Sequence, residues 1–166
     1  VRILMVHDRL DDDALSSVGD GIDRWLTAQK AEHPLVAEAQ RVPGEVPRWY
    51  VRLSGEQKDA IAIWLTLRER TLHYESYVLP APEENHAAFY EQLLRRNLKL
   101  YGLTFAIGGV DGVYLVGQRS ATDVDDDALD WIVGTMYHTV EQCFRPALRI
   151  GFASRLRDSA EADRAS

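Results

Sequence analysis

The chain is poor in cysteine, in runs of positive charge and in long apolar segments. Cys143 is its single cysteine, which excludes a disulfide within the chain and a cysteine-based zinc site. Lysine and arginine form no run, and the formal net charge is −7, so a nucleic-acid-binding face is not expected. The apolar stretch at residues 3–6 is far too short for a signal-peptide core or a membrane span. We therefore expect a cytoplasmic protein that binds neither nucleic acid nor membrane.

What is present is the composition of a globular protein. Of the 166 residues, 46% are hydrophobic and 27% are charged. A domain of roughly 150 residues buries about 70% of the surface that its unfolded chain exposes, so its core needs no metal or disulfide. Cys143 lies where helix periodicity places a buried residue, and we expect it to act as a small core hydrophobe.

Alternating apolar residues predict three strands in succession, at residues 49–53, 61–67 and 71–79. Short turns join these segments, which indicates an antiparallel meander. A helix that begins at Ser17 precedes them, and its apolar side consists of Val18, Ile22, Trp25 and Leu26.

A second helix and a hairpin follow a proline-containing break at residues 80–82. We expect this helix to end at Gly102 and to bury Leu94 and Leu98 within its apolar stripe. Asp111-Gly112 then supplies the positive-φ positions of a hairpin turn between two further strands.

A third helix starts within residues 123–127, where an acidic cluster suits the positive end of the helix dipole. Pro146 stops or kinks it. The order helix, three strands, helix, two strands, helix predicts an α+β fold, with helices packed on a five-stranded antiparallel sheet. We expect an N-terminal extension over residues 1–16, a single domain over 17–157 and a flexible tail over 158–166.

One face of the third expected strand combines an imidazole, a carboxylate and a phenol. His73, Glu75 and Tyr77 alternate along the strand, so their side chains leave the sheet on the same side. A proton-transfer site could use these groups, but the pattern is also typical of the polar, solvated side of an antiparallel sheet. No nucleophile or cofactor motif accompanies them, so we assign no catalytic residue.

Other polar motifs have a structural explanation. Glu83, Glu84 and His86 lie at a helix start, where carboxylates compensate the helix dipole, and no second ligand cluster completes a metal site. The glycine-rich loop 108–112 lacks the Lys-Ser/Thr of a phosphate-binding loop. Asn97 lies among apolar residues, where its amide can cap a turn, pin the hairpin or contact a partner. We predict neither a metal nor a cofactor.

Several segments resemble the bacterial YbjN family. They are Trp64-Leu65, residues 71–80, residues 90–97, Phe105-Ala106-Ile107 and Val113-Tyr114-Leu115-Val116. The resemblance covers roughly residues 18–156, in a family labelled as sensory-transduction regulators with a fold like that of type III secretion chaperones. It implies a binding module, because chaperones of this fold bind extended segments of partner proteins and commonly form homodimers. It transfers no catalytic residue.

We therefore expect a non-enzymatic protein-interaction domain, chaperone-like or regulatory, that recognises a partner segment through a sheet face or a helix groove. The candidate contact residues are Trp49, Trp64, Tyr74, Tyr77 and Asn97. Two alternatives stay open. One is a small-molecule-binding regulator with a pocket between sheet and helices, and the other is a hydrolase-like enzyme that uses His73 and Glu75.

Overall fold

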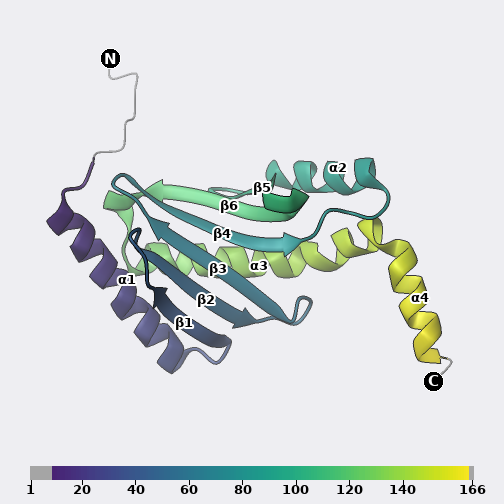
Figure 1. Ribbon diagram of the computed structural model, residues 1–166, viewed down its shortest axis with the longest axis horizontal. Helices are drawn as coiled ribbons and strands as arrows, with labels where there is room; N and C mark the ends of the chain where they lie inside the picture. Colours follow the sequence, from purple (N-terminus) through teal and green to yellow (C-terminus); the bar gives the residue numbers. More distant parts are fainter. Residues whose placement is uncertain (1–8, 165–166) are drawn as a thin grey trace, which may run out of the picture.

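The computed structural model describes residues 9–164, which form one antiparallel sheet with helices (Figure 1). Residues 1–8 of the expected extension and 165–166 of the expected tail lie outside the described part of the chain. In chain order the elements are α1 (Asp12–Glu32), β1 (Val36–Val42), β2 (Arg48–Ser54), β3 (Ala60–Leu67), β4 (Thr71–Leu79), α2 (His86–Asn97), β5 (Thr104–Ile107), the 3₁₀ turn η1 (Gly109–Asp111), β6 (Val113–Ser120), η2 (Ala121–Asp123), α3 (Asp126–Gly151) and α4 (Ala153–Arg164).

The sheet has six strands in the order β1-β2-β3-β4-β6-β5, and every neighbouring pair is antiparallel. The α+β class is confirmed, but the expectation of five strands is wrong because it missed β1. This edge strand contains alanine, glutamate and glutamine, and none of its side chains is fully buried. It therefore lacks the apolar alternation by which a strand is recognised.

Helices α1, α2 and α3 share the core with one side of the sheet. Helix α3 contacts β3 and β4, α1 contacts β1 and α3, and α2 contacts β5 and α3. In Figure 1, α3 runs behind the sheet while α1 and α2 flank it. Side chains alternate between buried and half-exposed along β3 and most of β4. We call the half-exposed side the open sheet face; it carries Tyr50, Trp64, Glu75, Tyr77 and Tyr114.

Helix α1 begins earlier than the expected Ser17. Asp11 is its N-cap, and the Asp11 carboxylate accepts the Ala14 N–H at 2.8 Å. Such a cap satisfies one of the free N–H groups of a first helical turn. The helix can therefore start at Asp12 even though glycines in its next turns weaken helix propensity.

Helix α3 continues through Pro146 to Gly151, so Pro146 does not stop it. A proline inside a helix leaves the carbonyl four residues earlier without its N–H partner. That carbonyl belongs to Gln142, and Arg96 Nη2 donates to it at 3.4 Å. Although α3 is 26 residues long, none of the described helices is long and apolar enough to cross a membrane.

The end of the chain forms a further helix that the sequence did not predict. Helix α4 includes residues 158–164 of the expected tail, and none of its described side chains is buried. Glu84 Oε1 accepts the Ser154 N–H at 2.6 Å, and Arg155 lies 3.1 Å from Glu83. These contacts attach the first turn of α4 to the loop before α2.

The β5–β6 turn is displaced from the expected Asp111-Gly112. Val110 and Asp111 have φ of 50° and 58°, whereas Gly112 is extended with φ of −69°. The pairing of β5 with β6 places the turn at Gly109–Gly112, and the Gly112 N–H donates to the Gly109 carbonyl at 3.1 Å. Two consecutive positive φ angles are typical of a type I′ hairpin turn.

The expected core position of Cys143 is confirmed. Its side chain is buried and its Sγ lies 3.5 Å from the Val140 carbonyl. Burial raises the pKa of the thiol to about 12. Because the thiolate is the reactive form of cysteine, this side chain is chemically inert at neutral pH.

Candidate functional site

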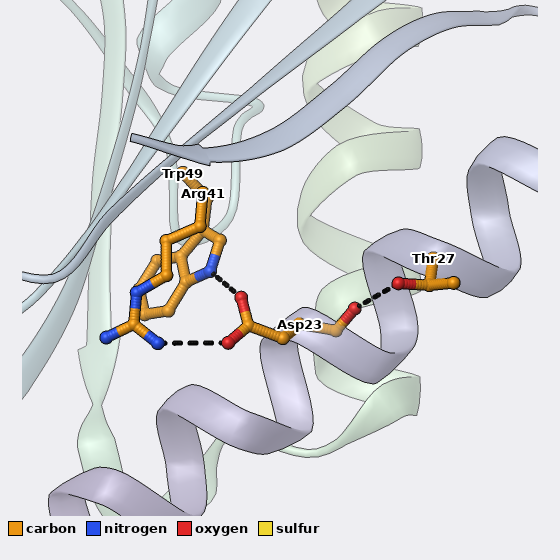
Figure 2. A network of polar contacts seen from close by, with 4 residues as sticks. All are labelled: Asp23, Thr27, Arg41 and Trp49. Atoms are coloured by element: carbon orange, nitrogen blue, oxygen red, sulfur yellow. Dashed lines mark hydrogen bonds and ion pairs between the residues drawn. The ribbon is translucent and has the colours of Figure 1, made fainter. Parts of the chain in front are cut away.

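Two of the aromatic residues expected at a binding surface are in the core. Trp49 is 0% exposed and Tyr74 is 2% exposed. Trp49 Nε1 donates to Asp23 Oδ1 at 2.6 Å, while Arg41 Nη1 lies 3.0 Å from Asp23 Oδ2 (Figure 2). The Tyr74 hydroxyl donates to the Gly102 carbonyl at 3.1 Å, and burial raises the pKa of Tyr74. Both rings hold elements of the fold together.

The other two aromatic candidates, Trp64 and Tyr77, lie on the open sheet face. The Arg48 guanidinium stands 4.3 Å from the centre of the Trp64 ring and forms an ion pair with Glu75 at 3.1 Å. Tyr77 is exposed and meets the edge of the Tyr114 ring at 5.4 Å between centres. This face therefore presents aromatic and arginine side chains, the types that are enriched at protein interfaces.

His73, Glu75 and Tyr77 form a row on this face rather than a convergent site. Glu75 is engaged by Arg48. Burial, followed by the charge of Arg68, lowers the pKa of His73, and Glu75 only partly opposes these effects. Among residues 9–164, no group of three or more His, Cys, Asp or Glu side chains is placed to hold a metal ion. A hydrolase-like site needs acid and base groups that converge in a cleft, and the row does not provide them.

Asn97 is bonded to the edge of the sheet. The Phe105 N–H donates to Asn97 Oδ1 at 2.8 Å, and Asn97 Nδ2 donates to the Phe105 carbonyl at 3.3 Å. Helix α2 ends at this asparagine, before the expected Gly102, which instead has a positive φ in the following turn. The amide thus pins the β5–β6 hairpin to the end of α2, one of the roles considered for it.

An exposed apolar surface lies where α2 runs beside β5. Leu94, Leu98, Ile107 and Val110 are 64%, 87%, 59% and 94% exposed. The hollow between the two elements has a volume of about 290 Å³ and is lined by Tyr90, Leu93, Leu94, Phe105, Ala106, Ile107 and Val113. We call Tyr90, Leu94, Leu98, Ile107 and Val110 the α2–β5 surface. Tyr90, Leu94 and Ile107 line the hollow together, while Leu98 lies at the C-terminal end of α2 and Val110 in the turn that follows β5. Exposed apolar side chains grouped around a hollow mark interaction sites on soluble proteins.

The expectation that Leu94 and Leu98 are core residues is wrong. Helix α2 carries two apolar stripes, and only the one with Phe89 and Leu93 is buried. Tyr90, Leu94 and Leu98 form the second stripe at four-residue intervals. Adjacent residues in a helix differ by about 100° in direction. Both can be buried, as Ile132 and Val133 are in α3, or only one, as Leu93 is beside Leu94.

Val110 is held in an unfavourable backbone conformation at the tip of the β5–β6 turn. Its φ of 50° and ψ of 34° lie in the left-handed region, which is an outlier for a β-branched residue. Strained residues of this kind cluster at functional sites. Here the strained turn holds one of the apolar side chains of the α2–β5 surface, 94% exposed, out in solvent.

A second hollow of about 400 Å³ lies between α1, α3 and the β1–β2 edge of the sheet. Val36, Val51, Leu53 and Val133 contribute apolar lining, and Gln29, His33, Asp130 and Tyr137 contribute polar groups. Gly134 also lines it, and a Cβ built there would meet no atom of the described residues within 4 Å. A larger side chain at position 134 would therefore fit without a clash, and the space next to Gly134 is empty of atoms of the described residues.

A protein-family model matches residues 19–149 of the chain. The model is that of YbjN, described as "Putative bacterial sensory transduction regulator". An uncharacterized protein of Mycobacterium leprae is 34% identical over 130 residues, which are 78% of this chain and 71% of that protein. Uncharacterized proteins of Mycobacterium tuberculosis and Mycobacterium bovis are 35% identical over 127 residues, which are 76% of this chain and 66% of theirs.

A solved structure has a similar fold. It is the crystal structure of the Yersinia pestis type III secretion chaperone SycH in complex with a stable fragment of YscM2. The TM-score is 0.50, the sequence identity is 14%, and the match covers 74% of this chain and 96% of that one. At this identity the likeness concerns the fold alone. Because the family model spans most of the chain and relatives are about a third identical to it over the matched residues, the chain belongs to the YbjN family.

Proposed function

We propose that this chain is a non-enzymatic protein-interaction domain of the bacterial cytoplasm, which binds a segment of a partner protein at the α2–β5 surface. The family is described in terms of regulation, and a protein of similar fold has been crystallised with a protein fragment. Both facts support a binding role, and neither identifies the partner.

The observation that carries the proposal is the apolar exposure of Leu94, Leu98, Ile107 and Val110. Fully burying one such side chain stabilises a protein by about 1.5–3 kcal/mol. The fold does not obtain this free energy from the four exposed side chains. A partner that covers the group recovers that free energy. Trp64 and Tyr77 on the open sheet face stay candidates for a second area of contact.

Site-specific photo-crosslinking tests the proposal. A photoreactive phenylalanine analogue replaces Leu94 in one variant and Val46 in a matched control, because Val46 is also apolar and exposed but lies in the β1–β2 loop. In native cells we expect position 94 to crosslink to a defined segment of one protein, and position 46 to give no such product.

A second substitution tests whether the crosslinked product depends on the α2–β5 surface. Adding Ile107→Ser should abolish crosslinking from position 94, whereas Val46→Ser should leave it unchanged. Equal crosslinking from positions 94 and 46, or no effect of Ile107→Ser, would contradict the proposal. A product made only of this chain would assign the surface to the homodimer that the fold resemblance implies, and sedimentation velocity across a concentration series measures that state.

The hollow between α1 and α3 favours a second candidate function, a regulator that binds a small molecule. An apolar lining with a few convergent polar groups is typical of ligand sites, and the unfilled space at Gly134 lies within it. A thermal-shift screen of metabolites should then find a compound that stabilises the chain and whose effect is lost in Gly134→Leu, which fills the hollow. A screen with no such compound removes this candidate.

A further inference from the structure

We infer that the α2–β5 surface receives an amphipathic helix with acidic flanks, and not an added β-strand. This inference deepens the proposed function and rests on it, because it requires the surface to be a protein interface. It concerns the conformation and charge of the partner segment. Three features of α2 and β5 support it: the occupied edge of β5, the length of the apolar wall, and the cations on α2.

The edge of β5 is poorly suited to accept another strand. Strand addition depends on a row of free backbone N–H and C=O groups, and β5 is only four residues long. The N–H and C=O of Phe105 are already bonded to Asn97. Directly after Ile107 the chain enters the turn at Gly109–Gly112. An incoming strand would have to displace Asn97 to make its main-chain bonds.

The apolar side chains instead form a short groove for another helix. Tyr90 and Leu94 line one wall of the hollow, and Leu98, the C-cap residue of α2, extends this row by one more helical turn. That wall is about 12 Å long, or roughly two turns of a partner helix. Ile107 projects from the opposite wall, and Leu93 and Phe105 contribute to the lining between them. A stripe of residues at i, i+3, i+4 and i+7 fits a groove of this form.

The charges beside the leucines favour an acidic partner. Arg95, Arg96 and Lys99 lie on the C-terminal half of α2 and the turn after it. Arg95 forms an exposed ion pair with Glu91 at 2.7 Å, and Arg96 Nη2 donates to the Gln142 carbonyl at 3.4 Å. The three cations still outnumber the one carboxylate of α2. Arg95 follows Leu94 and Lys99 follows Leu98, so a cationic row accompanies the leucine row about 100° around the helix. This local excess of positive charge occurs in a chain whose net charge is −7. Glutamates that flank an apolar stripe would meet it.

Peptide titrations followed by amide chemical-shift mapping test the inference. The probes are a hydrocarbon-stapled helix with leucines at i, i+3, i+4 and i+7 and glutamate flanks, the same helix with lysine flanks, and an unstapled peptide of alternating leucine and glutamate. The acidic helix should shift the amides of Leu94 and Ile107 and bind about tenfold more tightly than the lysine version, as expected for a few exposed ion pairs. The alternating peptide should shift neither.

Asn97→Ala supplies the complementary test, because it frees the Phe105 backbone groups. This variant should gain binding of the alternating peptide and keep its affinity for the acidic helix. If the alanine variant does not fold, Asn97→Asp replaces it; this variant frees only the Phe105 carbonyl, so a smaller gain in binding of the alternating peptide is expected. Leu94→Ser should lose the acidic helix, and Val46→Ser should retain it.

Failure of this inference is distinct from failure of the proposed function. Wild-type binding of the alternating peptide, stronger binding of the lysine helix, or no shifts at Leu94 and Ile107 with millimolar acidic helix would overturn it. The photo-crosslinking comparison between positions 94 and 46 is independent of these probes. A crosslinked partner segment that is extended, or not acidic, would leave the interface in place and remove only the helical, acidic occupant.

Discussion

At the scale of single residues, exposed and half-buried carboxylates connect parts of the chain that are far apart in sequence. Asp130 accepts the Trp25 indole N–H at 2.8 Å and a Gln29 amide N–H at 3.3 Å, which ties α3 to α1. Glu141 accepts backbone N–H groups of residues 56–58 and so fixes the β2–β3 turn to α3. Charge-assisted hydrogen bonds of this kind are stronger than neutral ones. Part of the acidic character of the chain is therefore structural.

Asp23→Ala should destabilise the fold by about 1–3 kcal/mol, the usual effect of leaving a buried donor unsatisfied. The affected donor is the indole N–H of Trp49, which is fully buried and bonds to Asp23 (Figure 2). Asp23→Asn keeps an acceptor and should have a smaller effect. Urea unfolding followed by circular dichroism measures the free energy of unfolding of each variant.

Arg41→Ala is the control for the ionic part of this network. It removes the Arg41–Asp23 ion pair, whose side chains are partly exposed, but leaves the indole bond intact. Its effect should stay within about 1 kcal/mol, as for other exposed pairs. If Arg41→Ala destabilised the fold more than Asp23→Ala, the ion pair rather than the indole bond would be the main contribution.

The Glu141 carboxylate should make stability depend on pH in the acid range. Burial alone would raise the pKa of Glu141, but hydrogen bonds from the N–H groups of Gln57, Lys58 and Glu56, together with Arg145, lower it overall. A carboxyl group with a lowered pKa in the folded state adds stability above its unfolded pKa, about 4.3, and loses it as the pH falls through the folded value.

Comparison with Glu141→Gln isolates this effect. The urea midpoint of the wild type should exceed that of the variant at pH 7. The difference between the two midpoints should become smaller as the pH falls below about 4.3. A gap that widens on acidification would show that the carboxylate does not favour the folded state. Arg145→Ala, which removes the coulombic contribution but not the N–H donors, should retain most of the pH dependence.

At the scale of elements, glycines within one helix have opposite roles. Gly134 lies in the middle of α3 with open space around it, whereas a Cβ at Gly151 would lie 2.7 Å from Phe89 Cδ2 and 2.9 Å from Pro82 Cβ. Gly134→Ala should therefore stabilise the chain by about 0.5–1 kcal/mol through helix propensity. Gly151→Ala should destabilise it by about 1–3 kcal/mol through overpacking. Thermal unfolding of the pair measures both, and a destabilised Gly134→Ala would contradict the open environment.

The turn between β5 and β6 should be more stable with a different residue at its tip. Val110→Asn places a residue that tolerates the left-handed region at a φ of 50°, and the gain should be about 1 kcal/mol. The same change removes an exposed apolar side chain, so crosslinking from position 94 should weaken while the melting temperature rises. A variant that keeps full crosslinking would separate Val110 from the proposed interface.

Much of the element order could be predicted from the sequence because apolar alternation marks strands that are buried on one side. Strands β2, β3 and β4 have that pattern. Strand β1 does not, since an edge position leaves its side chains half-exposed. The α2–β5 surface was missed for a different reason: an apolar stripe indicates burial in general, and only tertiary packing decides which of two stripes on α2 meets the core. Asn97 could be singled out, but not its bond to Phe105, which joins residues across a turn.

At the scale of the whole molecule, the sheet is covered by helices on one side, and α4 extends away from it at the C-terminal end (Figure 1). We propose that the folded domain ends near residue 157, as the sequence suggested. The contacts of α4 with the loop before α2 involve Ser154 and Arg155. The α4 side chains beyond residue 157 that the structure describes are all exposed.

Truncation after Arg157 should leave the melting temperature within about 2 °C of the full chain, because removal of exposed surface usually changes stability by less than about 0.5 kcal/mol. Differential scanning calorimetry measures both proteins. A fall of more than about 5 °C would mean that the last residues contribute to the folded domain. Truncation before Phe152, which is buried, serves as the destabilised comparison.

The bond between Asn97 and Phe105 also has a consequence for how the protein ages. Deamidation converts an asparagine amide to a carboxylate, which can still accept the Phe105 N–H but can no longer donate to the Phe105 carbonyl. Each such event would leave the Phe105 carbonyl on edge strand β5 without this donor, and unpaired groups on edge strands are where chains pair with one another. We therefore expect deamidation at Asn97, where it occurs, to favour polymerisation. Mass spectrometry and light scattering on aged samples would follow the two together.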